Sequence, residues 1–266
     1  MSQFKEILTE ICAEQGIRIE SLSHGYILRL IKAGKLRHIF GPFYDLNSAA
    51  ADRIACDKYA CHTMLKLGGI PVIQSELFFN PLRRPELCVT ESTWAMMLRY
   101  FKDNGCRIVV KPNQGSQGRD VYYCDNPADL ERAVQTIFAT EPDVLLSPYH
   151  DIETEYRVFY LNSRCHFVYG KTKGGSWMHN LSQGATAFEV TDKILLAKLT
   201  DLAKQSAECI NISFASVDIA ALTDNKLVVM EINSGVQAKF LLEQMPHLRE
   251  TIKAMYSEAI QMMYER

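Results

Sequence analysis

KPNQGSQGRDV (111–121) is the stretch that decides the fold, because it places a lysine at the end of an apolar strand and a glycine-bearing loop directly after it. Gly115 and Gly118 let backbone N–H groups close over phosphate oxygens, and Lys111 adds a positive charge near them. The loop lacks a Walker A pattern and joins a strand to a strand, so it is not a P-loop. Taken alone, a glycine hairpin of this kind is more often structural than functional.

Two later stretches, SVDIAAL (216–222) and VVMEIN (228–233), read as the adjacent strands of one hairpin. They present Asp218, Glu231 and Asn233 among apolar neighbours, and the last two are two residues apart, so they point to one face of the strand. Burying two carboxylates without compensation costs several kcal/mol each, and a divalent cation with oxygen ligands relieves that cost. The pattern favours a Mg²⁺ site, and the alternative is a strand end with solvated acids.

One strand end and several polar side chains are weaker indications. The strand that contains LLSPY (145–149) ends at a proline without an N–H, so a C=O at Ser147 and an N–H at Tyr149 could pair with an adenine edge. Cationic and amide side chains in polar loops, each more often a solvated residue, are Lys58, Arg157, Lys171 and Asn180. Lone histidines that could line a pocket, but are more often satisfied surface or core groups, are His24, His150, His166 and His179.

The composition is that of an ordinary globular protein. The chain has 266 residues, 47% hydrophobic and 23% charged, and a net charge of −2, so no global field recruits nucleic acid or an anionic membrane. No apolar run reaches the roughly 18 residues that a membrane span needs, and the N-terminus does not resemble a signal peptide. The eight cysteines form no CxxC pair and are expected to be buried thiols. We therefore expect a cytoplasmic protein that binds neither nucleic acid nor membrane.

Hydrophobic periodicity divides the chain into helices and hairpins. Helices are predicted over 3–15, 48–67, 92–104, 126–140, 191–210 and about 237–264. Strands are predicted within 26–40, 69–78, 107–112, 121–124, 143–149, 155–162, 164–171, 216–223 and 226–233. Residues 170–188 are polar and glycine-rich and are expected to form a loop. Antiparallel pairs predominate, which favours α+β lobes over a doubly wound parallel sheet.

The order and spacing of these features resemble the ATP-grasp superfamily. The order is a strand-borne lysine with a glycine loop, a strand end, an E-x-R strand, an N-L-x-x-G loop, and D…E-x-N on a hairpin. The chain looks most similar to the branch that contains ribosomal-protein-S6 glutamate ligase, cyanophycin synthetase and the ligase half of bifunctional glutathione synthetase, over about residues 45–240. The resemblance implies an α+β ATP-grasp fold in which two lobes grip ATP between them.

The resemblance also implies a role for each matching residue. The residues expected to contact ATP are Lys58, Lys111, Gln114, Gly115, Ser116, Gly118, Ser147, Pro148, Tyr149 and Glu155. Among them, residues 114–119 would form a lid over the phosphates, and Glu155 stands at the place of the family's ribose-contacting acid. The expected ligands of one or two Mg²⁺ ions, with Mn²⁺ as the alternative metal, are Asp218, Glu231 and Asn233. The residues expected to be catalytic are Arg157, which would hold the acyl phosphate or substrate carboxylate, Lys171 and Asn180.

The chain departs from the family pattern at three places. Asp120 stands where the lid often has a third glycine, and Met178 stands where the branch commonly has an arginine. Ser234-Gly235-Val236 follows E-I-N, where a small residue and a proline are usual. The N-terminal domain is also shortened, which leads us to expect a homodimer in which a second subunit completes the substrate-binding surface. The expected domains are a truncated N-terminal segment (1–47), an N-terminal lobe with the lid (48–147) and a C-terminal lobe with the Mg²⁺ site (148–266).

The resemblance implies an ATP-dependent carboxylate–amine ligase. The carboxylate would attack the γ-phosphorus of ATP, and an amine would then displace phosphate from the acyl phosphate to form an amide. The expected substrates are a small-molecule or peptide carboxylate and an amine, with an amino acid, a peptide or a related metabolite as the acceptor. Two alternatives stay open, an ATP-grasp phosphotransferase whose acceptor is a hydroxyl and a non-catalytic nucleotide-binding partner protein.

Overall fold

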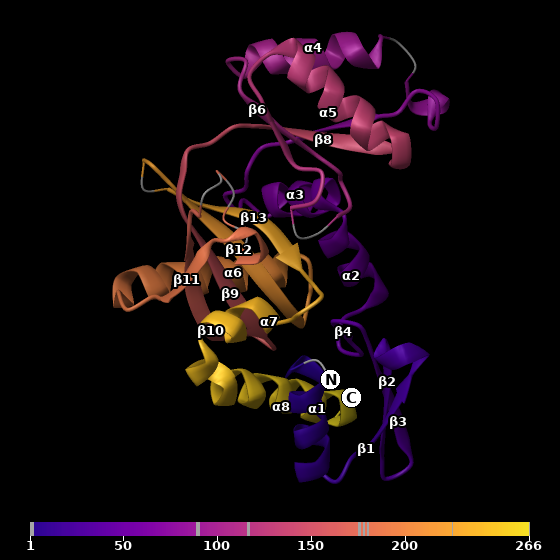
Figure 1. Cartoon of the computed structure of the whole chain (residues 1–266), viewed down its shortest axis with the longest axis vertical. Coiled ribbons are helices and arrows are strands. Elements are labelled where there is room, and N and C mark those ends of the chain that lie inside the picture. The colour runs from indigo at the N-terminus through magenta and orange to yellow at the C-terminus, as the bar shows by residue number, and fades with distance from the viewer. Residues whose placement is uncertain are drawn as a thin grey trace.

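The computed structural model describes residues 3–88, 91–115, 118–174, 177, 179, 181–224 and 226–265. Within these ranges the chain forms three antiparallel sheets, each packed against helices. The sheets follow one another along the long axis of the molecule, and both termini lie at the same end (Figure 1). This arrangement confirms the α+β class that the alternation of helices and hairpins predicts.

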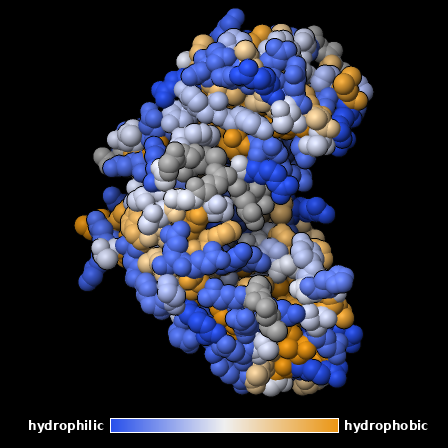
Figure 2. All heavy atoms as spheres, viewed as in Figure 1, coloured by the Kyte–Doolittle hydropathy of each residue, from blue (hydrophilic) through white to orange (hydrophobic). Residues whose placement is uncertain are grey.

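The N-terminal sheet packs against the first and the last helix of the chain. Its strands follow one another in sequence order: β1 (Arg18–Leu22), β2 (Ile27–Lys32), β3 (Lys35–Phe40) and β4 (Phe43–Tyr44). Leu28, Leu30 and Ile39 point inward and are buried against α1 (Gln3–Glu14) and α8 (Arg249–Glu265). The two ends of the chain therefore share one hydrophobic core. On the visible face, hydrophobic side chains gather over this sheet (Figure 2), where Leu36 and Phe40 are exposed.

The central sheet has the strand order β11-β10-β9-β12-β13. Its strands are β9 (Ile152–Leu161), β10 (Arg164–Thr172), β11 (Thr186–Glu189), β12 (Phe214–Leu222) and β13 (Leu227–Asn233). One face packs on α6 (Lys193–Cys209), and Val217, Ile219 and Leu199 lie in that core. Because successive strand residues point to opposite faces, Asp218 points away from α6.

The upper lobe in Figure 1 is a second α+β unit. Its sheet has the order β5-β8-β6-β7, with β5 (Glu76–Phe79), β6 (Ile108–Lys111), β7 (Tyr122–Cys124) and β8 (Asp143–Pro148). Helices α4 (Thr93–Asp103) and α5 (Pro127–Thr140) pack on it, and Phe101, Leu130, Val110 and Leu146 belong to its core. Among the residues that the structure describes, none of the helices combines the length and the apolar character that crossing a membrane requires.

The predicted helix over 48–67 is in fact two helices, α2 (Ala49–Cys56) and α3 (Lys58–Leu67). Asp57 interrupts it with an extended backbone (φ −100°, ψ 105°), and its carboxylate accepts a hydrogen bond from the N–H of Ala60 at 2.9 Å. The single helix was wrong because an aspartate side chain can satisfy the free N–H groups of a new helix and so competes with helix continuation. The break places Lys58 at the first position of α3.

The expected loop over 170–188 was wrong at both of its ends. Strand β10 continues to Thr172, and β11 pairs antiparallel with it, so that Tyr169 lies opposite Glu189. A four-residue edge strand has little periodicity of its own, and the partner strand supplies its order. Strand β1, which pairs with β2 before the predicted hairpin, was also not predicted.

The predicted domain boundaries at 47 and 147 stay a prediction. Two hydrophobic cores contain residues from more than one of the predicted domains. Residues of the N-terminal sheet share a core with α8, and α2 and α3 share one with the central sheet. The short helix α7 (Lys239–Gln244) follows the central sheet in sequence and contributes Leu241 and Leu242 to the core that contains α8.

Asn47 joins the N-terminal segment to the central sheet. Its side-chain oxygen accepts hydrogen bonds from the N–H groups of Ser213 (3.0 Å) and Phe214 (2.9 Å), and its amide nitrogen donates to the Phe214 carbonyl (2.9 Å). We expect Asn47→Ala to lower the free energy of unfolding by about 2 kcal/mol, because it leaves partly buried backbone groups without partners. Urea unfolding followed by circular dichroism measures this.

The matched control is Asn104→Ala, because within the described part of the chain the Asn104 side chain bonds only to the Tyr100 carbonyl of its own helix end. We expect this variant to change the free energy of unfolding by less than about 0.5 kcal/mol. Equal losses for the two variants would show that Asn47 is no more than a local turn residue.

Candidate active site

A cleft of about 360 Å³ lies between the upper lobe and the open face of the central sheet. It brings together thirteen of the sixteen predicted site residues: Lys58, Lys111, Gly115, Gly118, Ser147, Pro148, Tyr149, Glu155, Arg157, Lys171, Asp218, Glu231 and Asn233. Gln114 is exposed and does not line the cleft. Ser116 and Asn180 lie outside the residues that the structure describes. Strands and loops far apart in sequence thus meet in one place.

The floor of the cleft is one row of side chains across four neighbouring strands. The register pairs Tyr169 with Arg157, Arg157 with Asp218, and Asp218 with Glu231. Residues that lie directly opposite in an antiparallel sheet share a face, so all four side chains point into the cleft. The pairing, and not the sequence spacing, therefore sets which groups Asp218 meets.

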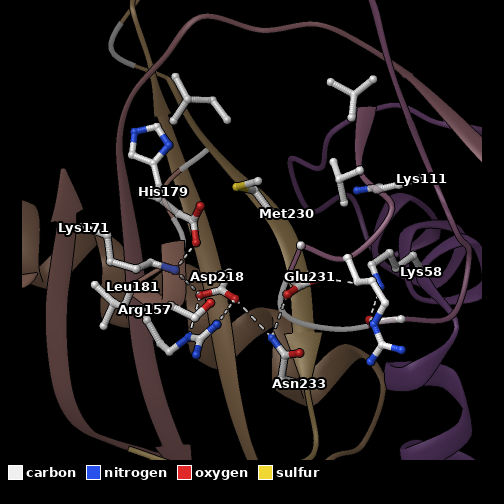
Figure 3. A pocket seen from close by; sticks show the side chains of 18 of the residues that line it. Lys58, Lys111, Arg157, Lys171, His179, Leu181, Asp218, Met230, Glu231 and Asn233 are labelled. Carbon is white, nitrogen blue, oxygen red and sulfur yellow. Dashed lines mark hydrogen bonds and ion pairs between the residues drawn. The ribbon is translucent and has the colours of Figure 1, made fainter. Parts of the chain in front are cut away.

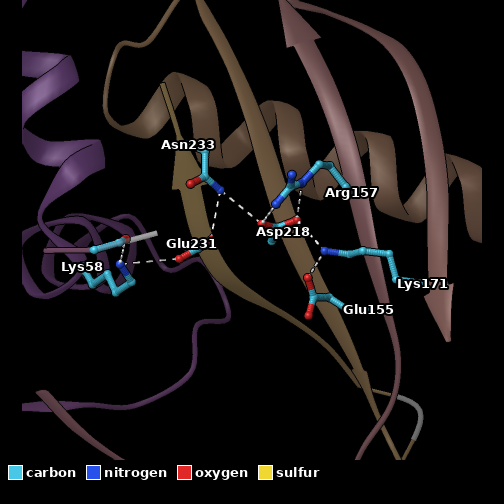
Figure 4. Close-up of polar contacts among 8 residues, drawn as sticks. Lys58, Glu155, Arg157, Lys171, Asp218, Glu231 and Asn233 are labelled. Atoms are coloured by element: carbon cyan, nitrogen blue, oxygen red, sulfur yellow. Dashed lines mark hydrogen bonds and ion pairs between the residues drawn. The ribbon is translucent and has the colours of Figure 1, made fainter. Parts of the chain in front are cut away.

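Asp218 is buried, with 2% of its surface exposed, and it is held by two cations. Arg157 donates two hydrogen bonds to its carboxylate, from Nε at 2.8 Å and from Nη2 at 2.6 Å. Lys171 donates from Nζ to Asp218 at 3.3 Å and also to Glu155 (Figure 4). Two cations and two carboxylates thus form a compact group whose formal charges cancel.

Burial and ion pairing act in opposite directions on the acids of this group. Desolvation disfavours the charged form of Asp218, but Arg157 and Lys171 outweigh it and hold the pKa of Asp218 below its usual range. For Glu155 desolvation is the larger effect, and it raises the pKa of that carboxyl although Lys171 opposes it. Asp218 therefore stays a carboxylate at neutral pH.

Asn233 links the two acids of the hairpin. Its amide nitrogen donates to Asp218 Oδ2 at 3.1 Å and to Glu231 Oε1 at 3.1 Å. Its oxygen points elsewhere, so Asn233 offers an oxygen to a cation only after the amide turns by half a rotation. Among the described residues, no three His, Cys, Asp or Glu side chains are grouped to hold a metal ion. The donor set is therefore two carboxylates and one amide, all hard oxygen ligands of the kind that Mg²⁺ takes.

The opposite wall of the cleft carries two lysines. Lys58 Nζ donates to the Gly115 carbonyl at 2.8 Å and lies 3.7 Å from Glu231 Oε2. Figure 3 shows Lys58 and Lys111 on one side of the cleft and the group of Asp218 on the other. Desolvation and the neighbouring charge of Lys58 lower the pKa of Lys111 to about 8. Lys58 has one carboxylate near it and Lys111 is desolvated beside Lys58, so this wall favours the binding of a further, multiply charged anion.

The backbone groups of residues 147–149 do not point where the sequence analysis expects them. The N–H of Tyr149 donates to the Arg107 carbonyl at 2.9 Å, and the register pairs Ser147 with Val109, so both residues turn their backbone groups toward β6. Backbone groups alternate along a strand, and those of Pro148 and His150 therefore face the other way. The prediction that the Ser147 C=O and the Tyr149 N–H meet an adenine edge was wrong, because both residues pair with β6. The sequence does not show which residues of β6 and β8 lie opposite one another.

Several cleft residues were not predicted. Trp177 lies next to Tyr149, with the ring centroids 6.1 Å apart, and both lie near Tyr123 of β7, while the Arg107 guanidinium stacks on Tyr149 at 4.7 Å. Met230 and His179 also line the cleft. Met230 could have been inferred from its place before Glu231. Trp177 lies in a polar loop without periodicity, and no pattern in the sequence indicates where it points. His179 lies in the same loop and, like His150, is one of the histidines named above as able to line a pocket.

Gly235 explains why the stretch after E-I-N departs from the usual pattern. A Cβ atom at this position would lie 2.8 Å from Pro42 Cγ, and the N–H of Val236 donates to the Pro42 carbonyl at 3.0 Å. The chain from the N-terminal sheet thus packs directly on the segment that follows Asn233. Pro42, Gln237 and Lys239 line this end of the cleft.

Comparison with known proteins places the chain in a family. Residues 55–246 match the RimK-like ATP-grasp domain. The chain is 26% identical over 220 residues to tetrahydromethanopterin:alpha-L-glutamate ligase of Methanosarcina acetivorans, which covers 74% of this chain and 61% of that relative. The chain therefore spans less than two thirds of the relative's length.

Solved structures share the fold at low sequence identity. D-alanine–D-alanine ligase of Bacillus anthracis matches 82% of this chain and 72% of its own with a TM-score of 0.63 and 15% identity. A bifunctional glutathione synthetase of Pasteurella multocida matches 98% of this chain and 43% of its own with a TM-score of 0.60 and 14% identity. The fold prediction is confirmed, and since the family match covers well over half of its residues, this chain belongs to the RimK-like ATP-grasp family.

Proposed function

We propose that this protein is an ATP-dependent ligase that joins a carboxylate to an amine through an acyl phosphate, releasing ADP and phosphate. One observation carries the proposal. The two acids and the amide of the β12–β13 hairpin face Lys58 and Lys111 across a single cleft. A triphosphate fits between an anion-binding wall and a floor that can hold a cation, and the relative from Methanosarcina acetivorans is by its name a glutamate ligase.

ATP lies across the cleft with its base at the strand end. The C=O of Pro148 and the N–H of His150 face away from β6, so they offer one acceptor and one donor to the adenine edge, one position later than Ser147 and Tyr149. Met230 and Ile152 supply apolar surface for the ring. The phosphates then reach Lys58 and Lys111, whose charges neutralise the oxygens that gain charge during transfer.

Asp218, Glu231 and Asn233 hold Mg²⁺ in this proposal, with Mn²⁺ as the alternative. The ion supplies Lewis-acid neutralisation of the phosphate oxygens. Asp218 is kept ionised by Arg157 and Lys171, so it remains a ligand at any pH near neutral. To hold the ion, Asn233 would offer its amide oxygen, and its nitrogen would then no longer bridge the two acids.

The reaction proceeds in two steps. An oxygen of the substrate carboxylate attacks the γ-phosphorus, the bond to the β-phosphate oxygen breaks, and ADP leaves. The amine then attacks the acyl carbon, the C–N bond forms, and phosphate leaves with the electron pair of the broken C–O bond. Arg157 Nη1 makes none of the bonds to Asp218 and, among the described residues, is available to hold the acyl phosphate. Closing the loop 114–119 over the phosphates would exclude water, which hydrolyses acyl phosphates.

The substrates are a small-molecule or peptide carboxylate and an amine, with an amino acid, a peptide or a related metabolite as the acceptor. We propose that the protein acts in the cytoplasm as a homodimer, without nucleic acid or membrane. The glutamate ligase relative supports a small acceptor. Light scattering on the purified protein tests the dimer.

We expect sustained ADP release only when a carboxylate and an amine are both present, because the acyl phosphate otherwise stays in the closed cleft. A screen of amino acids and short peptides in pairs, with ADP detection and mass spectrometry of the condensed product, measures this. Single compounds are the control. A product that carries phosphate on a hydroxyl would instead establish a phosphotransferase, and nucleotide binding without any turnover across the screen would favour a binding protein.

Lys111→Ala should lower kcat by about 100- to 1000-fold, because one preorganised donor to a developing charge is lost. Steady-state ADP formation with the active pair measures this. Lys102→Ala on α4 is the control, since Lys102 is exposed and does not line the cleft. Near-native ADP formation by Lys111→Ala would show that Lys111 does not neutralise the phosphates.

Glu231→Gln should raise the Mg²⁺ concentration needed for half-maximal activity by at least about 10-fold, the smallest loss typical of groups that merely orient a metal ligand. A magnesium titration of the initial rate measures it. Asp224→Asn, at the exposed tip of the same hairpin and paired with Lys226, is the matched control. An unchanged magnesium requirement in Glu231→Gln would remove this acid from the metal site.

A further inference from the structure

Met230 and Glu231 are consecutive residues of β13, yet both side chains line the cleft (Figure 3). In a regular strand, successive side chains point to opposite faces of the sheet. The register of β12 with β13 explains the exception. Asp218 pairs with Glu231, but the next residue of β12, Ile219, pairs with Val229. The register thus passes over Met230, which is the extra residue of a β-bulge.

The bulge changes which residues of β13 face the cleft. Val229 and Ile232 both lie in the apolar core under α6, although residues three apart would face opposite sides of a regular strand. The extra residue corrects the phase, so that Val229 reaches the core while Glu231 stays opposite Asp218. An apolar side chain from Met230 and a carboxylate from Glu231 thereby lie next to each other in the cleft.

The backbone of the bulge is held from outside the sheet. Strand β13 lies at the edge of the sheet, so its outer backbone groups need partners from other parts of the chain. The N–H of Val229 donates to the Pro71 carbonyl at 2.8 Å, and its carbonyl accepts from the N–H of Ile73 at 3.1 Å. At the bulged residue, the Met230 carbonyl accepts a hydrogen bond from His62 Nε2 at 2.8 Å.

The surroundings of His62 fix the orientation and the protonation of its ring. The residue is 5% exposed, and its Nδ1 atom lies 2.7 Å from Ser75 Oγ, directly before β5. A carbonyl oxygen can only accept, so Nε2 carries the proton and Nδ1 accepts from the Ser75 hydroxyl. Burial and the charge of Lys111 lower the pKa of His62 to about 4. The ring is therefore neutral at neutral pH and keeps one donor for the Met230 carbonyl.

Helix α3 contacts the bulge at two points. Lys58 and His62 are four residues apart on this helix and therefore lie on one side of it. Lys58 Nζ lies 3.7 Å from Glu231 Oε2, while His62 bonds the backbone of Met230. The helix thus holds the side chain of one bulge residue and the backbone of its neighbour.

We propose that His62 is a positioning residue that fixes the β-bulge at Met230 and thereby keeps Glu231 aimed at the metal ion. Met230 is held beside the nucleotide base by the same bond. The inference rests on the proposed function, since it needs Mg²⁺ and a nucleotide in the cleft. His62 does not line the cleft itself and acts through the backbone of β13.

Two substitutions separate the bonds of His62. In His62→Gln the side-chain amide reaches the place of Nε2 and can donate to the Met230 carbonyl. In His62→Asn the shorter side chain reaches only the place of Nδ1, beside Ser75. Calorimetric titration with ADP, once with Mg²⁺ and once with EDTA, gives the gain in affinity that the ion provides.

We expect His62→Asn to reduce this Mg²⁺ gain by about 10-fold, the smallest loss typical of residues that orient a metal ligand. His62→Gln should keep the gain within about twofold of wild type, because the donor is retained. Should His62→Asn not fold, Ser75→Ala takes its place. Its expected loss is about threefold, since the ring keeps its donor but loses the bond that orients it.

Hydrogen–deuterium exchange of the free protein tests the bulge without any ligand. Backbone amides of residues 227–233 should exchange faster in His62→Asn than in wild type, because the edge of β13 has lost a bond. Residues 152–161 of the same sheet should exchange as in wild type. In His62→Gln, both segments should exchange as in wild type.

His247→Asn is the matched control, because His247 is an exposed histidine outside the cleft that bonds Glu189. It should change neither the Mg²⁺ gain nor the exchange of residues 227–233. A His62→Asn protein that is less stable to heat but has an unchanged Mg²⁺ gain would show a purely structural role and overturn the inference. Equal losses of the gain in His62→Asn and His62→Gln would overturn it as well, since the donor would then not matter.

A failure of the proposed function gives a different result. Wild type would then bind ADP no better with Mg²⁺ than with EDTA, and the metal site would fail together with the inference about Glu231. The exchange of residues 227–233 would still show whether His62 holds the bulge, because it needs neither the ion nor the nucleotide.

Discussion

The buried charge group around Asp218 is the constraint on which the cleft depends. Arg157 and Lys171 neutralise Asp218, and Lys171 also neutralises Glu155. Removing one partner of a buried pair typically costs about 3–5 kcal/mol, since it leaves a charge without compensation. The group therefore holds β10, β9 and β12 in one register. A slip by one residue would turn Asp218 into the apolar core under α6, where no described cation could meet it.

The cleft carries more cations than its own carboxylates neutralise. Seven cationic side chains and three carboxylates line the cleft among the described residues. Three of the positive charges are already used on the carboxylates, by Arg157, Lys171 and Lys58. Lys111 is desolvated and lies near Lys58, which lowers its pKa. A triphosphate would relieve this repulsion, so the charges of the cleft favour an anion over a neutral ligand.

Segments far apart in the sequence hold the residues of the cleft in place. The N-terminal sheet and α8 share a core, and Pro42 packs on Gly235 directly after Asn233. Asn113, in the glycine-bearing loop, accepts hydrogen bonds from the N–H groups of Lys58 and Tyr59 at the start of α3. The break of the helix at Asp57 is what exposes these N–H groups. Local features that look like irregularities thus place the two lysines opposite the acids.

The sequence by itself determined most of the helices and strands, since their periodicity and caps are local, and it identified Asp218, Glu231, Asn233, Lys58 and Lys111 as members of one site through their order along the chain. Tertiary structure alone decided how strands pair. Strand β11 exists because β10 orders it, and the register with β6 turns the N–H of Tyr149 toward the Arg107 carbonyl. His179, in a loop without periodicity, lines the cleft only because of how that loop lies on the central sheet. The alternation of side chains follows from the sequence of each strand. The pairing register of the strands and the contacts of the loops depend on segments that are far apart in the sequence.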